Sequence, residues 1–300
     1  MNLVSHGHDL SLTSLIDRLK TTPPSCGTKR ALELVDELMQ FELGRFLIEN
    51  RGLNGIWTSY IVLHPIKGRI TRLNSAGQPF SDLESWLLNR APAFLATQER
   101  FAIFQELTQQ NLKSGMQLAS IPCGLMDDLL SLDYSGLHGV EVTGIDLDDT
   151  SLKAAAINFD TRKPLISAHF EKKDAWTLDT CEHWDFITSN GLNIYIPEDS
   201  KVTQLYRQFH QSLKPAGQLL ISFLSKSPSQ DPQSPWEIYD KADLKLHMLL
   251  FSEILQIKWQ SFRTVAQTRA QLEAAGFEVQ TVRYDGQRLF PTVLAKKKAI

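Results

Sequence analysis

One glycine and one aspartate, separated by about 20 residues, carry the clearest chemical signal in the sequence. Gly124 follows a short apolar run, Met116 to Ile121, and Asp146 ends a second apolar run that begins at Val140. A strand, a tight turn, a helix and a second strand that ends on a carboxylate form a unit that holds a nucleoside. In such a unit the turn approaches the ligand with bare backbone, and the carboxylate accepts hydrogen bonds from the ribose hydroxyls. We therefore expect Gly124 and Asp146 to line a nucleoside site.

The turn lacks the glycine-rich fingerprint of dinucleotide enzymes, since Gly124 is the single glycine in it. A pyrophosphate needs a glycine-rich turn so that several amides can approach it, whereas a ligand without phosphate needs less. The sequence therefore favours S-adenosylmethionine, an adenosine that carries an amino acid, over a nicotinamide cofactor.

The elements that must position these residues follow Ser114 and Gly115, where apolar runs begin to alternate with helical segments. Apolar runs joined by crossover helices are typical of a parallel sheet with both faces covered. A later helix at 262–275 precedes two segments, 277–282 and 289–294, that we expect to pair as a closing hairpin. Before it, we expect strands at 116–121, 140–145, 165–170, 184–189 and 217–224, and helices at 125–134, 150–158 and 199–213.

The N-terminal third has mostly helical periodicity, and we expect a helical cap over residues 1–112 and a second domain over 113–300. Apolar spacing predicts one long helix from Ala31 to about Asn50, whereas the segment 56–65 is too aromatic and β-branched to favour a helix. Ser81 and Glu84 form a capping-box pattern at the start of a helix that runs to Arg90. Helices are also expected at 94–112 and, within an insertion at 226–259, at 241–259.

Composition limits the classes of partner. The net charge of −3 gives no overall basic field for nucleic acid, and we find no apolar run of the ~20 residues that a membrane span needs. Cys26, Cys123 and Cys181 are widely spaced, which predicts neither a zinc site nor a disulfide framework. The N-terminus lacks the pattern of a signal peptide. We expect a cytoplasmic protein that uses no metal and binds neither nucleic acid nor membrane.

Six stretches of the second domain carry a family resemblance: Ala119–Met126, Gly144–Asp146, Glu171–Trp176, Trp184–Gly191, Leu213–Ile221 and Leu272–Phe277. Through them, residues 114–298 resemble the class I S-adenosylmethionine-dependent methyltransferase family. Pro122 and Met126 stand where the family has glycines, and Ser120 replaces its usual acid. The resemblance implies a Rossmann-like α/β sandwich with a seven-stranded, mostly parallel sheet whose last strand is antiparallel.

The resemblance also implies which residues hold the cofactor. The carboxylate of Asp146 would take the ribose, Asp174 would meet the adenine amino group, and Asn190 would lie near the reacting sulfonium. We hypothesise that Asp127 or Asp128 grips the methionine ammonium, and we read Cys123 as a small buried residue. The full cofactor set is Pro122, Cys123, Gly124, Asp127, Asp146, Leu147, Asp174, Ala175, Trp176, Ser189, Asn190, Gly191 and Tyr195.

Catalytic residues are weakly encoded, because the sulfonium is already an activated electrophile and the site must mainly orient the acceptor. His64 and His247 are the candidate general bases, since histidine titrates near neutral pH. Tyr195, just after the fourth strand, could contact the methyl group or the acceptor. Each of these three residues has a structural reading as well. Further acceptor-side candidates are Trp57, Tyr60, Asn193, Trp236 and Tyr239.

We therefore expect a methyltransferase that methylates oxygen or nitrogen of a small-molecule acceptor by SN2 displacement. Two rivals stay open. One is another enzyme on the same fold, such as an aminopropyl transferase or a nucleotide-dependent oxidoreductase. The other is a module without turnover that binds a nucleoside or a partner protein. The insertion at 226–259 covers the acceptor in the first reading, and it is a homodimer contact or core padding in the alternative.

Overall fold

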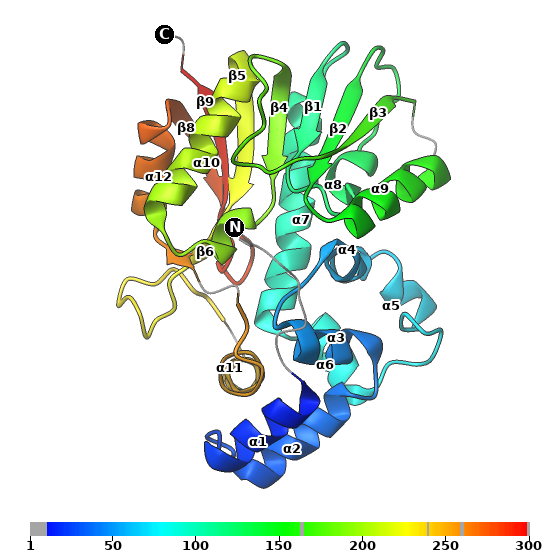
Figure 1. Cartoon of the computed structure of the whole chain (residues 1–300), viewed down its shortest axis with the longest axis vertical. Coiled ribbons are helices and arrows are strands. Elements are labelled where there is room, and N and C mark those ends of the chain that lie inside the picture. The colour runs from blue at the N-terminus through cyan, green and yellow to red at the C-terminus, as the bar shows by residue number, and fades with distance from the viewer. Residues whose placement is uncertain (1–10, 163–164, 239, 259–260, 299–300) are drawn as a thin grey trace. The chain divides into compact units, whose positions relative to one another are not determined.

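The computed structural model describes residues 11–162, 165–238, 240–258 and 261–298. These residues form two compact units (Figure 1). The first unit contains residues 1–98 and 237–260, and the second contains residues 99–236 and 261–300. The segment 237–260 therefore belongs to the same unit as the N-terminal helices, although it is far from them in the sequence.

The second unit is built on a seven-stranded sheet with the order β3-β2-β1-β4-β5-β9-β8 (Figure 1). The pairs from β3 to β5 are parallel, and β9 pairs antiparallel with both β5 and β8. The strands are β1 (Gln117–Ser120), β2 (Glu141–Asp146), β3 (Ser167–Lys172), β4 (Trp184–Ser189), β5 (Leu213–Ser222), β8 (Phe277–Arg283) and β9 (Thr292–Lys297). The predicted fold is confirmed, including the antiparallel last strand.

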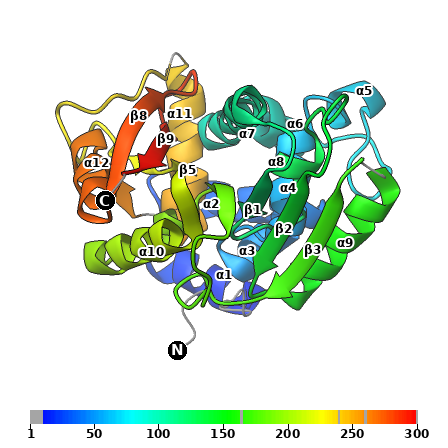
Figure 2. The same ribbon diagram turned by 90° about the horizontal axis from the view of Figure 1, so that it is seen from above.

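Helices cover both faces of this sheet (Figure 2). On one face, Ala119, Ile187 and Leu219 pack with α10 (Asp199–Ser212) and α12 (Val265–Ala274). On the other face, their neighbours Leu118, Phe186 and Leu220 pack with α7 (Pro92–Asn111), α8 (Asp127–Leu130) and α9 (Asp149–Arg162). Successive residues of a strand point to opposite faces, so strands buried on both faces read as unbroken apolar runs. A separate pair of short strands, β6 (Leu224–Ser225) and β7 (Phe262–Arg263), is parallel.

Two predicted boundaries in this unit are wrong in an informative way. The expected helix at 125–134 is a single turn, α8, and beyond its end the Asp133 carboxylate accepts from the Ser135 N–H at 2.9 Å. Such a local bond offers the backbone an alternative to continuing the helix. The last strand, expected at 289–294, begins only at Thr292, because the Asp285 carboxylate draws the N–H groups of Leu289 and Phe290 into a turn.

The first unit is helical in its described residues. The expected long helix from Ala31 to Asn50 is two helices, because the chain turns after Leu38. Gly44 makes this possible, since a Cβ on it would lie 2.0 Å from the Leu38 carbonyl oxygen. The helices are α1 (Leu12–Thr21), α2 (Gly27–Leu38), α3 (Glu42–Asn50), α4 (Gly55–Leu63), α5 (Gly68–Thr71), α6 (Asp82–Asn89) and α11 (Lys241–Met248), and the π-helical turn η2 (Leu249–Ile254) follows α11.

Helix α4 contradicts the reading of 56–65 as unfavourable for a helix. The Asn54 side chain accepts from the Trp57 N–H at 3.0 Å and caps it. Ile61 and Val62 are buried, and this burial outweighs the lower helix propensity of these β-branched residues.

Helix α6 begins as predicted, with the Ser81 hydroxyl accepting from the Glu84 N–H at 3.2 Å. The Glu84 carboxylate is 0% exposed and accepts from the Tyr60 hydroxyl and the Asn74 amide instead of the cap backbone. Half of the capping box is therefore present, and Glu84 serves to join α6 to α4.

The segment 237–260 is held in the first unit by polar and aromatic contacts. The Trp86 indole donates to the Asp243 carboxylate at 2.7 Å, and Arg90 pairs with the same carboxylate. The rings of Phe94 and Phe251 lie 5.7 Å apart. A search of the described helices finds none with the length and hydrophobicity needed to cross a bilayer.

Candidate functional site

The predicted nucleoside residues meet at the carboxyl ends of β1 and β2. One Asp146 carboxylate oxygen accepts from the Gly124 N–H at 2.9 Å, and the other accepts from the Asp148 N–H at 3.0 Å. Gly124 has φ +50°, a conformation that disfavours side chains. The turn and the carboxylate are therefore joined directly, and Leu147, which follows Asp146, is 48% exposed at the same edge.

Burial raises the pKa of Asp146, although the backbone N–H groups of Asp148 and Gly124 lower it in part. The ionised carboxylate is thus held where its own solvation is poor. A ligand that donates hydrogen bonds would replace the water that this carboxylate has lost.

The substitutions in the turn do not fill the space above it. Met126 is 0% exposed. Its sulfur and the Cys123 sulfur each lie 3.1 Å from the position of a Cβ on Gly144. Gly144 therefore lets both side chains pack down against β2, and burial raises the pKa of the Cys123 thiol. This geometry agrees with the reading of Cys123 as a small buried residue, while Pro122 is half-buried beside it.

Asp127 and Asp128 bond within the protein. Asp127 pairs with Arg162 at 2.5 Å and accepts from the Asn158 amide at 3.1 Å. Asp128 accepts from the Ser120 and Thr188 hydroxyls, which tie α8 to β1 and β4, and burial raises its pKa. Both carboxylates are under 9% exposed, so their hypothesised grip on an ammonium group would have to displace these contacts.

The residues after β3 form a compact turn. The Asp174 side chain accepts from the Trp176 N–H at 3.0 Å, and Ala175 is buried. The Trp176 indole donates to the Lys201 carbonyl at 2.9 Å and packs against the core beside α10. The ring of Trp176 is thus fixed by the protein itself.

The end of β4 supplies the next group. Ser189 is buried, and the Asn190 side-chain oxygen accepts from the Ser222 hydroxyl at 3.4 Å. Gly191 has φ +90° and leads into a 3-10 turn, η1 (Leu192–Tyr195). Within η1, the Asn193 amide donates to the Tyr206 hydroxyl at 2.7 Å, so Asn193 has a structural partner. Tyr195 is partly exposed at the end of this turn.

Arg100, on α7, lies beside this group and was missed by sequence reasoning. Its Nη1 donates to the Ser222 hydroxyl at 3.3 Å and lies 3.3 Å from the position of a Cβ on Gly191. A signal was available, since Arg100 stands in the buried stripe of α7 between Ala96 and Phe104. A charged residue in an apolar stripe is rare without a purpose.

His64 belongs to the first unit, where its tautomer is fixed. The Asn89 amide nitrogen donates to the Ser85 carbonyl, so the Asn89 oxygen faces His64 Nε2 at 3.0 Å and also accepts from Arg69. Nε2 must therefore carry the proton, which leaves a lone pair on Nδ1. Nδ1 is buried against Gly68 without a partner, and burial lowers the pKa of His64.

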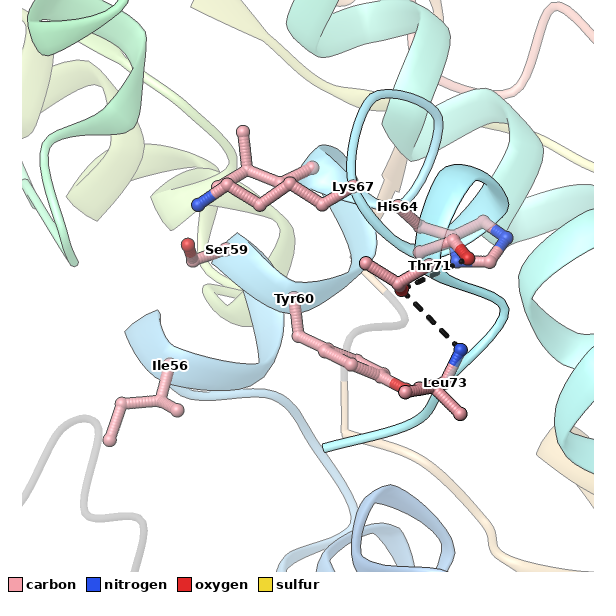
Figure 3. A pocket seen from close by; sticks show the side chains of 9 residues that line it. Ile56, Ser59, Tyr60, His64, Lys67, Thr71 and Leu73 are labelled. Atoms are coloured by element: carbon pink, nitrogen blue, oxygen red, sulfur yellow. Dashed lines mark hydrogen bonds between the residues drawn. The ribbon is translucent and has the colours of Figure 1, made fainter. Parts of the chain in front are cut away.

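Helices α4 and α5 and the residues that follow them line a pocket of about 310 Å³ (Figure 3). The Thr71 hydroxyl accepts from the Leu73 N–H at its edge. Its walls are apolar and aromatic with one cation, and the residues are Ile56, Ser59, Tyr60, Leu63, His64, Lys67, Gly68, Thr71 and Leu73.

His247 is also in the first unit, 6% exposed and 4.7 Å from the Phe251 ring. Burial lowers its pKa to about 4.

The acceptor-side candidates Trp57 and Tyr60 form an edge-to-face pair, with ring centroids 5.4 Å apart. Among the other acceptor-side candidates, the Trp236 indole donates to the Ser225 hydroxyl, and Tyr239 lies outside the described residues. The described residues contain no group of three or more histidine, cysteine or acidic side chains placed to hold a metal ion.

Residues 121–217, which run from the end of β1 into β5, match the profile of a family described as "Methyltransferase domain". No protein of curated function matches the sequence significantly.

A Bordetella parapertussis protein of known crystal structure, described as a possible exported protein, has 42% sequence identity to this chain and a TM-score of 0.85. That match covers 95% of this chain and 93% of the other. Two distant structures share the fold. The cyclase SpnF has 15% identity and a TM-score of 0.52, over 82% of this chain and 96% of its own. A Nostoc punctiforme protein described as a candidate O-methyltransferase has 13% identity and a TM-score of 0.51, over 81% of this chain and 70% of its own.

The sheet order, the methyltransferase-domain match and the carboxylate-linked turn between β1 and β2 agree with one another. Together they show a methyltransferase domain over residues 121–217 and the fold of the class I S-adenosylmethionine-dependent methyltransferases.

Proposed function

We propose that this protein transfers a methyl group from S-adenosylmethionine to an oxygen or nitrogen atom of a small organic acceptor. The observation that carries the proposal is the direct bond between Gly124 N–H and the Asp146 carboxylate, at the carboxyl ends of adjacent parallel strands. Open α/β sheets bind ligands outside the carboxyl ends of their strands, and an acid at the end of a strand can accept hydrogen bonds from a ribose there.

The residues at this edge fit the cofactor. Asp146 would accept from the ribose hydroxyls, and the turn that Asp174 closes would border the adenine beside Leu147 and Ala175. Ser189, Asn190 and Gly191, after β4, would lie along the methionine part. When bound, S-adenosylmethionine supplies an activated methyl group, so the chain itself must orient the acceptor, exclude water and accept a proton.

We propose His64 as the proton acceptor. The Nε2–H bond to Asn89 leaves Nδ1 as the basic atom, and the lowered pKa keeps the ring neutral near pH 7. Nδ1 is closed in by Gly68, so it can take a proton only from a group that enters the pocket there. His247 and Tyr195 remain the alternative catalytic residues, but His247 has an apolar setting that supports a structural role.

The acceptor is proposed to be small and partly apolar. The walls of the pocket in the first unit, with Ile56, Tyr60 and Leu73, support this class. The N-terminal helices and the segment 237–260 would form the acceptor cap.

We also propose that the protein is cytoplasmic, since all three cysteines are unpaired. A homodimer remains a prediction that hydrodynamic measurement can test.

A second candidate is a protein that binds S-adenosylmethionine but does not transfer its methyl group. The cyclase SpnF has a similar fold, which supports this second candidate, because one fold can carry reactions other than methyl transfer. An aminopropyl transferase is a third possibility on the same site.

Calorimetry and a transfer assay test the proposal together. We expect S-adenosylmethionine and S-adenosylhomocysteine to bind and a nicotinamide dinucleotide to give no heat. Methyl-labelled cofactor should then label at least one member of a panel of phenols, carboxylates and amines, as read by mass spectrometry. Binding without labelling across the panel would favour the second candidate, and a signal with the dinucleotide alone would refute the cofactor assignment.

A further inference from the structure

Arg100 is a buried cation with most of its hydrogen-bonding capacity unused. The residue is 5% exposed, its Nη1 donates to the Ser222 hydroxyl, and its guanidinium carbon lies 4.4 Å above the Phe290 ring. Its Nε is buried without a partner. A guanidinium carries five N–H donors, so one hydroxyl and one ring leave this group under-satisfied, and burial lowers its pKa to about 10.

Arg263 shows how the same fold treats an arginine with a structural role. It is 2% exposed, its Nε donates to the Asp199 carboxylate, and its two terminal nitrogens donate to the carbonyls of Asn193 and Ile196. Each of the three nitrogens of that guanidinium has an acceptor. The contrast indicates that the empty donors of Arg100 are not a general property of buried arginines in this protein.

The acid that acts on Arg100 through its charge is Asp285. The two oxygens of its carboxylate accept hydrogen bonds from the N–H groups of Leu289 and Phe290, at 3.2 and 2.7 Å. Asp285 therefore lowers the electrostatic cost of burying Arg100 but supplies no fork-to-fork pair. Arginine binds carboxylates best through two parallel N–H···O bonds, and no carboxylate of the described residues makes such a pair with Arg100.

The place of Arg100 in the fold points to a ligand. Its Nη1 lies above Gly191, and its partner Ser222 also bonds Asn190. These residues follow β4 and end β5, at the carboxyl edge where open α/β sheets bind ligands. Asp146 ends β2, which is separated from β4 by β1, so Arg100 lies on the side of this edge away from the ribose carboxylate.

We propose that Arg100 binds a carboxylate of the ligand held at this edge. A single cation balances one negative charge, which favours a carboxylate over a phosphate dianion. The carboxylate comes either from the methionine part of the cofactor or from the acceptor, and in both cases the inference rests on the proposed function for the place of the ligand.

Calorimetry with two nucleosides distinguishes the sources. S-adenosylhomocysteine carries the methionine carboxylate, and 5′-methylthioadenosine lacks it. If the cofactor supplies the carboxylate, Arg100→Met should bind S-adenosylhomocysteine roughly tenfold to hundredfold more weakly, as expected for a lost charge-assisted bond. Its affinity for 5′-methylthioadenosine should not change, and Arg100→Lys should recover part of the loss.

If the acceptor supplies the carboxylate, the two nucleosides should bind Arg100→Met as they bind the wild type. Benzoate should then raise the melting temperature of the wild type, with and without S-adenosylhomocysteine, while benzamide should not. Arg100→Met should lose the benzoate response. Unchanged affinity for S-adenosylhomocysteine together with no Arg100-dependent benzoate response would overturn the proposal.

Arg263→Met is the matched control for folding. It should melt at a clearly lower temperature, because it removes the bonds of Arg263 to the Asp199 carboxylate and to the carbonyls of Asn193 and Ile196, whereas Arg100→Met should stay within a few degrees of the wild type. A large stability loss in Arg100→Met without a selective ligand effect would assign Arg100 a structural role. If the wild type binds neither nucleoside, the proposed function fails, and the benzoate arm still tests Arg100 by itself.

Discussion

Asp146→Asn should separate the binding role of this carboxylate from its structural role. The substitution keeps the shape of the side chain but replaces one oxygen with an N–H₂ group, which donates and cannot accept. In the wild type, the two oxygens accept from Gly124 and Asp148 at 2.9 and 3.0 Å. A bound ribose needs the same oxygens as charged acceptors.

The two effects have different sizes. A charge-assisted hydrogen bond contributes about 1.5–3 kcal/mol, so we expect roughly tenfold to hundredfold weaker binding of S-adenosylhomocysteine. The change in unfolding free energy should stay within about 1 kcal/mol. Burial raises the pKa of Asp146, so its ionised form is less favourable in the fold than in the unfolded chain, and stability falls as pH rises through that raised pKa. Asparagine removes this cost while losing one backbone bond.

Calorimetry and urea unfolding at several pH values check both parts. The wild type should be more stable relative to Asp146→Asn at acidic pH than at neutral pH. Asp148→Asn is the control, because it removes a charge two residues away. The Asp148 carboxylate accepts from the N–H groups of Thr150 and Ser151 at the start of α9, and asparagine caps a helix as well as aspartate does. A large stability loss in Asp146→Asn with unchanged S-adenosylhomocysteine affinity would refute the reasoning and leave Asp146 a purely structural residue.

Three further substitutions test the first unit. Gly44→Ala should lower the unfolding free energy by about 3 kcal/mol, because its Cβ would meet the Leu38 carbonyl oxygen, as measured by urea titration. His247→Leu should flatten the acid side of the stability profile: the folded pKa of about 4 lies below the unfolded value of 6.5, so the wild type should lose about 3 kcal/mol as pH falls across that interval. Trp86→Phe should cost about 2 kcal/mol, because it removes the indole bond to the buried Asp243 carboxylate.

Each of these has a control or a contrary outcome. Gly77→Ala meets no atom within 4 Å, so at φ +73° it should cost only about 1–2 kcal/mol, and equal losses in the two glycine variants would contradict the clash. Parallel pH profiles for the wild type and His247→Leu would show that His247 does not remain neutral on folding. Trp176→Phe loses a neutral bond to a carbonyl and should cost less than Trp86→Phe.

The sheet could be predicted closely because each strand carries its own signal. The apolar run 184–189 coincides with β4, and the start of α10 at Asp199 was also placed correctly. The helix boundaries of the first unit were harder, since the turn after Leu38 depends on a close backbone contact at Gly44. No local pattern of hydrophobicity records such a contact.

The candidate site also has features that the sequence predicts and features that only the folded structure shows. Gly124 and Asp146 could be paired from spacing alone, because parallel strands end at one edge. Their direct hydrogen bond, and the internal partners of Asp127 and Asp128, appear only in three dimensions. Arg100 was overlooked because its sequence neighbours give no indication of which groups surround it.

The sequence by itself determined the class of fold and the edge of the sheet where a nucleoside would bind, because alternation, turn residues and strand-end acids are local properties. Tertiary structure decided which charges are already satisfied and which are left for a ligand. The physical reason is that burial and partners come from residues far apart in the chain: Ser222 and Phe290 surround Arg100, and Asn89 sets the tautomer of His64.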